Sequence, residues 1–311
     1  MSSIDELLRR PRRTGIACAI GAVLLGLVYM MIAGAPTAYL VINAGACVLG
    51  LLILAMLDLI VPAMRRQSGA ATFVLALGLL ATALLGDRVD GAARWIDLGV
   101  LYVQPSLILL PIMIVGFARS RDAFSTAGLI VAAVALAIQP DRAMAGMLTA
   151  GLATLVIVRR DQFTVTALFG SIIAFAATLL QVDGLPAMPF VEQILYSSFD
   201  NGLVAGLAVL GGSIVLVVPA ILGWVCDIEN RHTYAVFGAI WIAAIAAAAV
   251  GNYPTPVVGY SGGAVLGYVL SLTILPTVAR SRLETNRASG TENVDAKSIN
   301  QTLRLAAGCP A

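Results

Sequence analysis

A carboxylate and a guanidinium follow a proline between two apolar segments of this sequence, in the tetrapeptide Gln139-Pro140-Asp141-Arg142. Each flanking segment, read as a helix of about 16 residues, would cover roughly 24 Å, which is less than the ~30 Å core of a bilayer. We therefore expect the connection to be drawn into the membrane, where such charges line protein or a wet cavity. A purely structural charge balance between Asp141 and Arg142 is the alternative.

Two more segments interrupt the apolar pattern with polar residues, and we call such segments polar breaks. They lie closer to the N-terminus. Residues 86–99 read GDRVDGAARWIDLG and place Arg94 and Trp95 among three aspartates. This pattern fits a functional site, and equally an interfacial tryptophan with ordinary loop charges. In Gln104-Pro105-Ser106, the proline could simply open a helix, because its missing N–H costs nothing there.

A fourth break, residues 251–263, reads GNYPTPVVGYSGG and is too apolar for an ordinary solvated loop. Such a segment is typical of a re-entrant or cavity-lining connection, here including Tyr260, Ser261 and Gly262. Its glycines could equally form a small-residue packing face.

The longest loop that we expect on the outer side of the membrane covers residues 182–201. It carries Asp183, Glu192 and Asp200. Its stretch PFVEQILYSSF has apolar residues at helical spacing. That spacing predicts an amphipathic helix in the membrane interface.

The elements that position these residues follow from composition. Hydrophobic residues make up 59% of the 311 positions and charged residues only 12%, a balance that no soluble domain of this size could cover with a polar surface. The apolar stretches run to roughly 16 to 25 residues, the length of spanning helices and not of barrel strands. We predict an all-α, polytopic integral membrane protein with about ten spans, near 14–34, 38–63, 70–86, 100–117, 123–138, 143–158, 162–181, 202–225, 234–251 and 261–279.

The arginines predict the orientation of these spans. Cytoplasmic loops retain Lys and Arg, and with the N-terminus inside, all but three of the 19 basic residues fall in cytoplasmic segments. The three outside are Arg88, Arg94 and Arg142. We therefore predict that both termini are cytoplasmic, with an N-terminal segment 1–13, a membrane domain 14–280 and a disordered tail 281–311.

Other features of the sequence bound its function. The apolar run after RRPRR is longer than a signal-peptide core, so we interpret it as the first span. The four cysteines have no paired spacing, which supports neither a disulfide framework nor a metal site. The net charge of +2 is explained by topology and indicates no nucleic-acid partner. No cofactor is indicated with certainty, and a divalent metal is left open.

The order of the polar motifs resembles the SEDS family of bacterial cell-wall membrane proteins, the FtsW/RodA/SpoVE group. The family's GARRWI-x-LG and QPSE motifs are similar to GAARWIDLG at 91–99 and VQPS at 103–106. Its QPDLGTA resembles QPDRAMA at 139–145, and its PLPFVSYGGSS resembles PTPVVGYSGGA at 254–264. The resemblance covers nearly the whole membrane domain.

The resemblance implies a multi-pass protein of the bacterial inner membrane that polymerises glycan strands from lipid II and acts with a class B penicillin-binding protein. Arginines would pair with the lipid pyrophosphate, and a carboxylate would remove the proton from the attacking sugar hydroxyl. The residues implied for substrate binding are Arg94, Trp95, Gln104, Gln139, Asp141, Arg142, Tyr260, Ser261 and Gly262.

The base is where the sequence departs from the family. The family's outer loop after the seventh helix carries an Asp in PE-x-x-TDFIF, and the ungapped position here is Val191. Glu192 is one residue further on, so Glu192 or Asp183 would be the base. The acidic residue of QPSE and the basic residue three positions later are replaced by Leu107 and Leu110, a coupled loss that leaves no lone buried charge.

Three hypotheses follow for the function. The first is a divergent SEDS-type peptidoglycan glycosyltransferase serving cell division or elongation. The second is a non-catalytic relative that binds the division or elongation machinery, or a lipid-linked precursor, and regulates a partner. The third is a flippase or transporter for a lipid-linked sugar, although the two halves show no repeat of the kind that many transporters carry.

Overall fold

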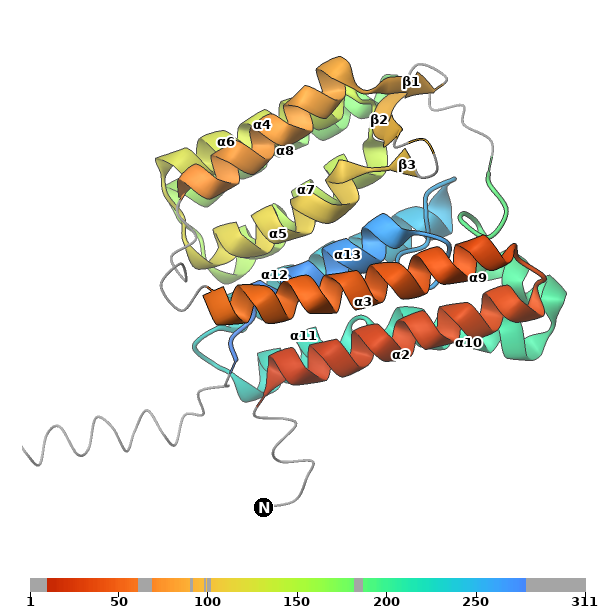
Figure 1. The fold of residues 1–311 in the computed structure, drawn as a ribbon. Coiled ribbons are helices and arrows are strands. Elements are labelled where there is room, and N and C mark those ends of the chain that lie inside the picture. The colour runs from red at the N-terminus through yellow and green to blue at the C-terminus, as the bar shows by residue number, and fades with distance from the viewer. Residues whose placement is uncertain are drawn as a thin grey trace, which may run out of the picture.

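The computed structural model describes residues 10–60, 69–89, 92–97, 99, 102–181 and 187–277. The described chain is a bundle of helices that run nearly parallel to one axis (Figure 1). In chain order the helices are α2 Pro11–Ile32, α3 Thr37–Ile60, α4 Gly69–Leu85, α5 Pro105–Arg119, α6 Ala123–Ile138, α7 Arg142–Val158, α8 Gln162–Leu179, α9 Ile194–Ser197, η1 Ser198–Asn201, α10 Leu203–Val215, α11 Val218–Cys226, α12 Arg231–Val250, α13 Gly262–Ser271 and η2 Leu272–Ile274.

The helices confirm the prediction of a polytopic membrane fold. Five are long and apolar enough to cross a bilayer, counting α10 and α11 together, and five shorter apolar helices lie among them. Large apolar side chains remain exposed on the surface of the bundle, including Leu85 at 85%, Ile157 at 83% and Leu180 at 88%. Because soluble monomers do not expose so much contiguous apolar surface, this surface is lipid-facing.

Each predicted span contains a helix, with three differences in detail. The last span, predicted at 261–279, is helical only from Gly262 to Ile274, and residues 61–63 and 278–279 lie outside the described residues. The span at 202–225 is broken into α10 and α11 at Leu216-Val217, just before Pro219 in the first turn of α11. A proline there cannot donate the hydrogen bond that a continuous helix needs. The fourth span begins at Pro105 rather than near residue 100, because residues 102 and 103 are drawn into strand pairing.

A small antiparallel sheet was not anticipated by the all-helical prediction. Strands β1 Asp87–Val89, β2 Ala92–Asp97 and β3 Tyr102–Val103 pair in the order β1-β2-β3, with Ile96 opposite Val103. Backbone groups at the edge of a membrane need partners, and the sheet supplies them where the sequence indicated only a loop. It covers one end of the bundle and carries Arg94.

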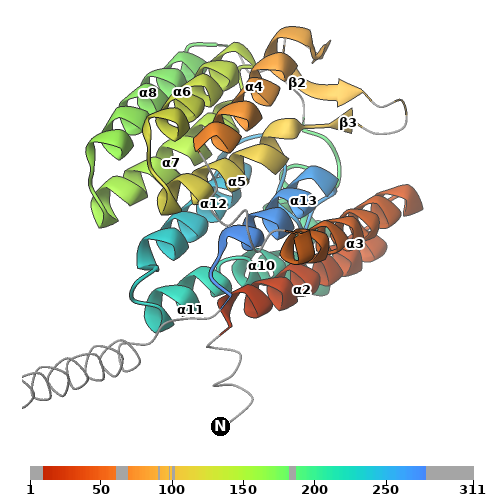
Figure 2. The ribbon, with the colours of Figure 1, turned by 60° about the vertical axis from the view of Figure 1, so that its left-hand side comes forward.

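Two central helices, α12 and α13, hold the core together. Figure 2 shows them between the group formed by α4, α6 and α8 and the group formed by α2, α3 and α10. The Tyr268 ring of α13 lies 5.5 Å from that of Phe237 and 5.0 Å from that of Trp241, both on α12. All three side chains are fully buried. Aromatic packing therefore joins the two halves of the bundle.

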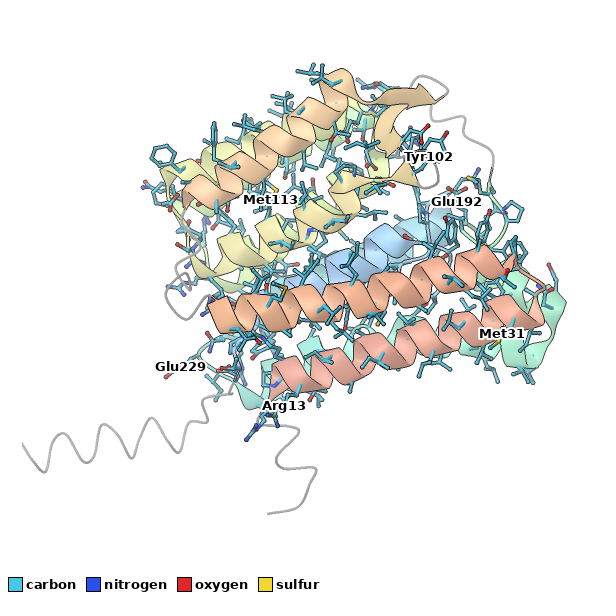
Figure 3. The ribbon with its side chains drawn as sticks, in the orientation of Figure 1. Arg13, Met31, Tyr102, Met113, Glu192 and Glu229 are labelled. Atoms are coloured by element: carbon cyan, nitrogen blue, oxygen red, sulfur yellow. The ribbon has the colours of Figure 1, made fainter. Side chains whose placement is uncertain are left out.

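Both ends of the described chain lie at the same end of the bundle. The buried guanidinium of Arg12, at the start of α2, donates to the carbonyl of Leu272 at 3.0 Å and to that of Thr273, and pairs with Asp58 at 2.5 Å. Figure 3 shows Arg13 and Glu229 at this end, and Tyr102 and Glu192 at the opposite one. We call these the basic end and the pocket end.

Candidate functional site

A pocket with an empty volume of about 500 Å³, part of it open to the surroundings, lies at the pocket end. It brings together the β2 strand, the starts of α5 and α7, the loop before α9 and the loop after α12. Its lining residues are Arg94, Trp95, Gln104, Leu107, Asp141, Ala143, Met144, Glu192, Ala244, Asn252, Tyr253, Pro254 and Pro256.

Asp141 is the most buried charged group of this pocket, with 1% of its surface exposed. Its Oδ2 accepts hydrogen bonds from Gln104 Nε2 at 2.9 Å and from Ser106 Oγ at 3.0 Å. Its Oδ1 accepts from the backbone N–H of Met144 at 3.3 Å, because Asp141 is the N-cap of α7. These bonds compensate the burial of the carboxylate and fix its orientation.

Arg94 reaches from β2 to the turn between α6 and α7. Only 5% of it is exposed, and it donates from Nε to the carbonyl of Gln139 at 3.3 Å and from Nη2 to that of Pro140. Its guanidinium also lies 5.9 Å from the centre of the Trp95 ring. The sheet thus places the Arg94 guanidinium in the pocket wall. It lies next to the turn at Gln139 and Pro140, which directly precedes Asp141.

Glu192 enters the pocket from the loop between α8 and α9. It forms an isolated β-bridge with Pro254, and the N–H of Thr255 donates to the carbonyl of Val191 at 2.9 Å. One oxygen of its partly exposed carboxylate accepts from the N–H of Met188 at 3.0 Å. Val191 is 8% exposed, so the residue at the ungapped position is packed inward while its neighbour lines the pocket.

Strained backbone surrounds the pocket. The non-glycine residues with positive φ among those the structure describes are Pro140, Phe190, Gln193 and Val257, and every one directly precedes or follows a lining residue or, for Phe190, lies two residues from Glu192. At Val257, with a φ of 68°, a β-branched side chain crowds its own backbone, and at Pro140 the φ of 28° is far from the value near −65° that the proline ring favours. Strain of this kind gathers at functional sites, where the surrounding structure holds it in place.

Five of the residues predicted from the sequence therefore meet in one pocket: Arg94, Trp95, Gln104, Asp141 and Glu192. Gln139 contributes only its backbone. Its side chain donates from Nε2 to the carbonyl of Leu79 at 3.2 Å, and its Oε1 is buried without a hydrogen-bond partner. Asp183 lies outside the described residues.

The structure places the other predicted residues away from the pocket lining. Arg142 turns toward the C-terminal end of α8, where its Nη2 donates to the carbonyl of Gln181 at 3.0 Å. Tyr260 stacks on Tyr39 with ring centres 3.8 Å apart. The Ser261 Oγ caps α13, and Gly262 packs on α3, where an added Cβ would meet Ile42 at 3.3 Å.

Two lining residues with polar side chains were missed as individual candidates, Asn252 and Tyr253. Both lie in the Pro- and Gly-rich segment that the sequence predicts to line a cavity. The sequence therefore indicated where they lie, but neither side chain was predicted to take part in the site. Asn252 Oδ1 accepts from Gln193 Nε2 at 2.7 Å, which ties the two pocket loops together.

The chemistry available in the pocket is that of acids, bases and hydrogen bonds. Apart from one guanidinium, two carboxylates, two side-chain amides and the side chains of Trp95 and Tyr253, the lining is aliphatic. A partly exposed carboxylate can accept a proton from a hydroxyl, and a guanidinium can pair with a phosphate oxygen. Within the described ranges, no three or more His, Cys, Asp or Glu side chains gather in a way that could hold a metal ion.

No protein family model matches the sequence, and no curated protein sequence matches it either. Solved structures do match. The crystal structure of the rod shape determining protein RodA of Thermus thermophilus superposes with a TM-score of 0.62 at 20% identity, over 83% of this chain and 93% of that one. A point variant of the same RodA gives a TM-score of 0.60 at 19% identity, over 83% and 94% of the two chains.

A chain from a peptidoglycan synthase complex, in which polymerisation and crosslinking are coordinated, gives a TM-score of 0.59 at 18% identity, over 83% of this chain and 94% of that one. Likeness at this level of identity concerns the fold, and the motif order had pointed to the same fold. The chain is a multi-pass membrane protein with the RodA fold.

Proposed function

We propose that this protein is a divergent SEDS-type peptidoglycan glycosyltransferase of the bacterial inner membrane, which polymerises lipid II with Glu192 as its general base. The observation that carries the proposal is the meeting of Glu192 with Arg94, Asp141 and Gln104 in one pocket of a RodA-like fold. These residues are separated by up to about 100 positions in the sequence, and a fold that only packed its core would not need to gather them.

The pocket suggests how the groups divide the work. Arg94 would pair with the pyrophosphate oxygens of the donor lipid, a contact for which the guanidinium fork is suited. Glu192 would take the proton from the hydroxyl of the acceptor sugar as that oxygen bonds to the anomeric carbon of the donor. The bond from that carbon to the pyrophosphate breaks, and undecaprenyl pyrophosphate leaves with the bonding electrons. Asp141, held by Gln104 and Ser106, would position the turn on which Arg94 rests.

The same proposal includes a partner and an orientation. A match to a chain of a complex that couples polymerisation to crosslinking supports a class B penicillin-binding protein as the partner. Ten spans with both termini in the cytoplasm would place the pocket on the outer side, where lipid II is presented for polymerisation. The arginines at the basic end support that orientation.

The test is polymerisation of fluorescent lipid II by the purified protein, with and without a candidate class B partner. Glu192→Gln keeps the shape of the side chain and removes its basicity, so we expect a loss of roughly 10² to 10⁴-fold. The matched control is Glu229→Gln, an exposed glutamate at the basic end that should polymerise as the wild type does. Wild-type rates for Glu192→Gln, in protein with unchanged thermal unfolding, would remove Glu192 from the mechanism.

Asp183→Asn belongs in the same assay. If this substitution abolishes polymerisation while Glu192→Gln does not, the role of the base passes to Asp183. If the wild-type protein is inactive where a RodA polymerase is active, the glycosyltransferase proposal fails altogether.

The buried Val191 favours one second candidate, a non-catalytic relative that regulates its partner. An apolar side chain at the ungapped position of the family's Asp is what such a protein would carry. Capture of a class B penicillin-binding protein by a variant lacking both Asp183 and Glu192, with cell growth maintained, would support this function against the first.

A further inference from the structure

Arg142 was predicted as a site residue, but it does not line the pocket that contains Glu192. Its surroundings therefore need a separate explanation. At the start of α7, its Nη2 donates to the carbonyls of Thr178 at 3.4 Å and Gln181 at 3.0 Å, while its Nε is buried without a hydrogen-bond partner. No carboxylate pairs with it within the described part of the chain. It is a partly exposed cation at the pocket end, on a membrane-facing side of the bundle.

Directly beside Arg142 begins a groove between α6 and α8, two helices that lie next to each other at the edge of the bundle (Figure 2). The groove has an empty volume of about 730 Å³, including the space at its open side. Apart from Gln181 its lining is apolar, and it consists of Val134, Ala137, Ile138, Gly170, Ile173, Ala174, Ala177 and Gln181.

Small side chains and one polar link give the groove its form. Gly170 and Ala177 lack the bulk that would close the space between the helices. Gln181 Nε2 donates to the carbonyl of Ala137 at 3.0 Å, which joins the two helix ends above the groove. The backbone carbonyl of the same Gln181 accepts from Arg142, so the cation stands at the mouth of the groove.

The α8 wall of the groove is about as long as one leaflet of a membrane is thick. From Gly170 to Gln181, α8 and its C-terminal turn rise by roughly 16 Å at 1.5 Å per residue, against about 15 Å for half of a ~30 Å hydrocarbon core. An apolar groove with one wall of this length and a cation at its polar end is complementary to an acyl chain attached to a phosphate.

From these observations we infer that the α6–α8 groove is a binding site for a glycerophospholipid of the leaflet on the pocket side. One acyl chain occupies the groove, and the headgroup phosphate pairs with Arg142. This site is separate from the pocket that contains Glu192, because the two share no lining residue. The inference does not depend on the proposed polymerase activity.

The test is native mass spectrometry of the full-length protein in mild detergent, titrated with phosphatidylglycerol or with diacylglycerol of the same chains. We expect one tightly held phosphatidylglycerol, retained at least tenfold better than diacylglycerol. Ala177→Phe fills the groove and should weaken this retention at least tenfold. Ala176→Phe, on the neighbouring exposed residue outside the lining, should retain lipid as the wild type does.

The role of the charge is tested separately. Arg142→Gln should lower phosphatidylglycerol retention to the level of diacylglycerol, and Arg142→Lys should restore most of it. If Ala177→Phe does not fold, Val134→Phe fills the groove from an exposed position on α6 instead. Equal retention by the two alanine variants, equal retention of the two lipids by the wild type, or displacement of phospholipid by tenfold less undecaprenyl phosphate would overturn the assignment.

Discussion

Asp141 and Arg142 are adjacent in sequence, yet their side chains point in different directions and contact different helices. Asp141 caps α7 and accepts from Gln104 and Ser106, whereas Arg142 reaches the end of α8. Consecutive residues at a helix start do not face each other, so the charge balance that the sequence allowed as an alternative is not the arrangement found. The carboxylate belongs to the pocket and the guanidinium to the membrane-facing side of the bundle.

The hydrogen bonds of Asp141 predict its contribution to stability. Asp141→Ala would leave Gln104 Nε2, the Ser106 hydroxyl and the Met144 N–H without their shared acceptor in a buried place. We expect the free energy of unfolding in mixed micelles to fall by about 2–3 kcal/mol, since bonds to a charged group are worth more than neutral ones. Asp200→Ala, at an exposed residue of η1, should change it by less than about 0.5 kcal/mol.

An equal effect of the two substitutions would contradict this account of Asp141. It would mean that water entering the pocket replaces the carboxylate at no cost to the fold.

At the scale of elements, the helices could be predicted because their signal is local. An apolar run of sufficient length marks a span whatever it packs against, and the segment at 123–138 was predicted at the bounds of α6. The sheet could not be found in this way, since β1 and β3 contain three and two residues and exist only through pairing with β2. The amphipathic helix expected in the loop before α10 is shorter, because Pro189 to Glu192 form a turn and a bridge to Pro254.

The same reasoning explains which site residues were predicted. Gln104 and Asp141 stand out as polar groups next to apolar segments, which a sequence shows directly, whereas Arg94 lies among loop charges and was selected through the motif resemblance. The contact of the Glu192 loop with the Pro254 loop joins segments about 60 residues apart, and only the folded chain reveals it. The direction in which the Arg142 side chain points likewise depends on the residue at which α8 ends. Hydropathy does not locate the end of a helix to within one turn.

Close approach of α5 and α13 makes a prediction for a single glycine. A Cβ on Gly267 of α13 would lie 2.0 Å from the carbonyl oxygen of Leu107 on α5, so Gly267→Ala must push the two backbones apart. We expect a loss of about 1–3 kcal/mol in the free energy of unfolding, as for other overpacked cores. Gly211→Ala is the matched control, because its Cβ would meet only Leu25 Cδ1, at 3.8 Å.

Thermal unfolding of both variants in detergent checks this expectation. The control should unfold at or slightly above the wild-type temperature, since alanine is the better helix former. Wild-type stability of Gly267→Ala would show that α5 and α13 can separate freely.

The whole molecule is polarised between its two ends. Arg12 joins the first described helix to the last at the basic end, and Arg119 joins α5 to the same place by donating to the carbonyl of Ile274 at 2.6 Å. Arg121 pairs there with Asp161 at 2.7 Å, and burial together with the nearby Arg159 lowers the pKa of Arg121. The pocket, with its single lining arginine, lies at the other end.

This polarity predicts the topology in the membrane, because arginines concentrate on the side from which the chain is inserted. In a background where Cys18, Cys47, Cys226 and Cys309 are replaced by serine, Asp200→Cys places an exposed thiol in η1, directly after α9 at the pocket end (Figure 1), and Glu229→Cys places one at the basic end (Figure 3). A membrane-impermeant thiol reagent added to intact bacterial cells should label Asp200→Cys and spare Glu229→Cys. Permeabilised cells should show labelling of both.

The reverse pattern would place the pocket in the cytoplasm. Lipid II presented on the outer side could not reach Glu192 in that case, and the polymerase proposal would fail together with the orientation. The phospholipid site would survive the reversal, because the groove would then face the inner leaflet with the same length and the same arginine. The labelling experiment therefore separates the proposal that needs an outer pocket from the one that needs only a membrane.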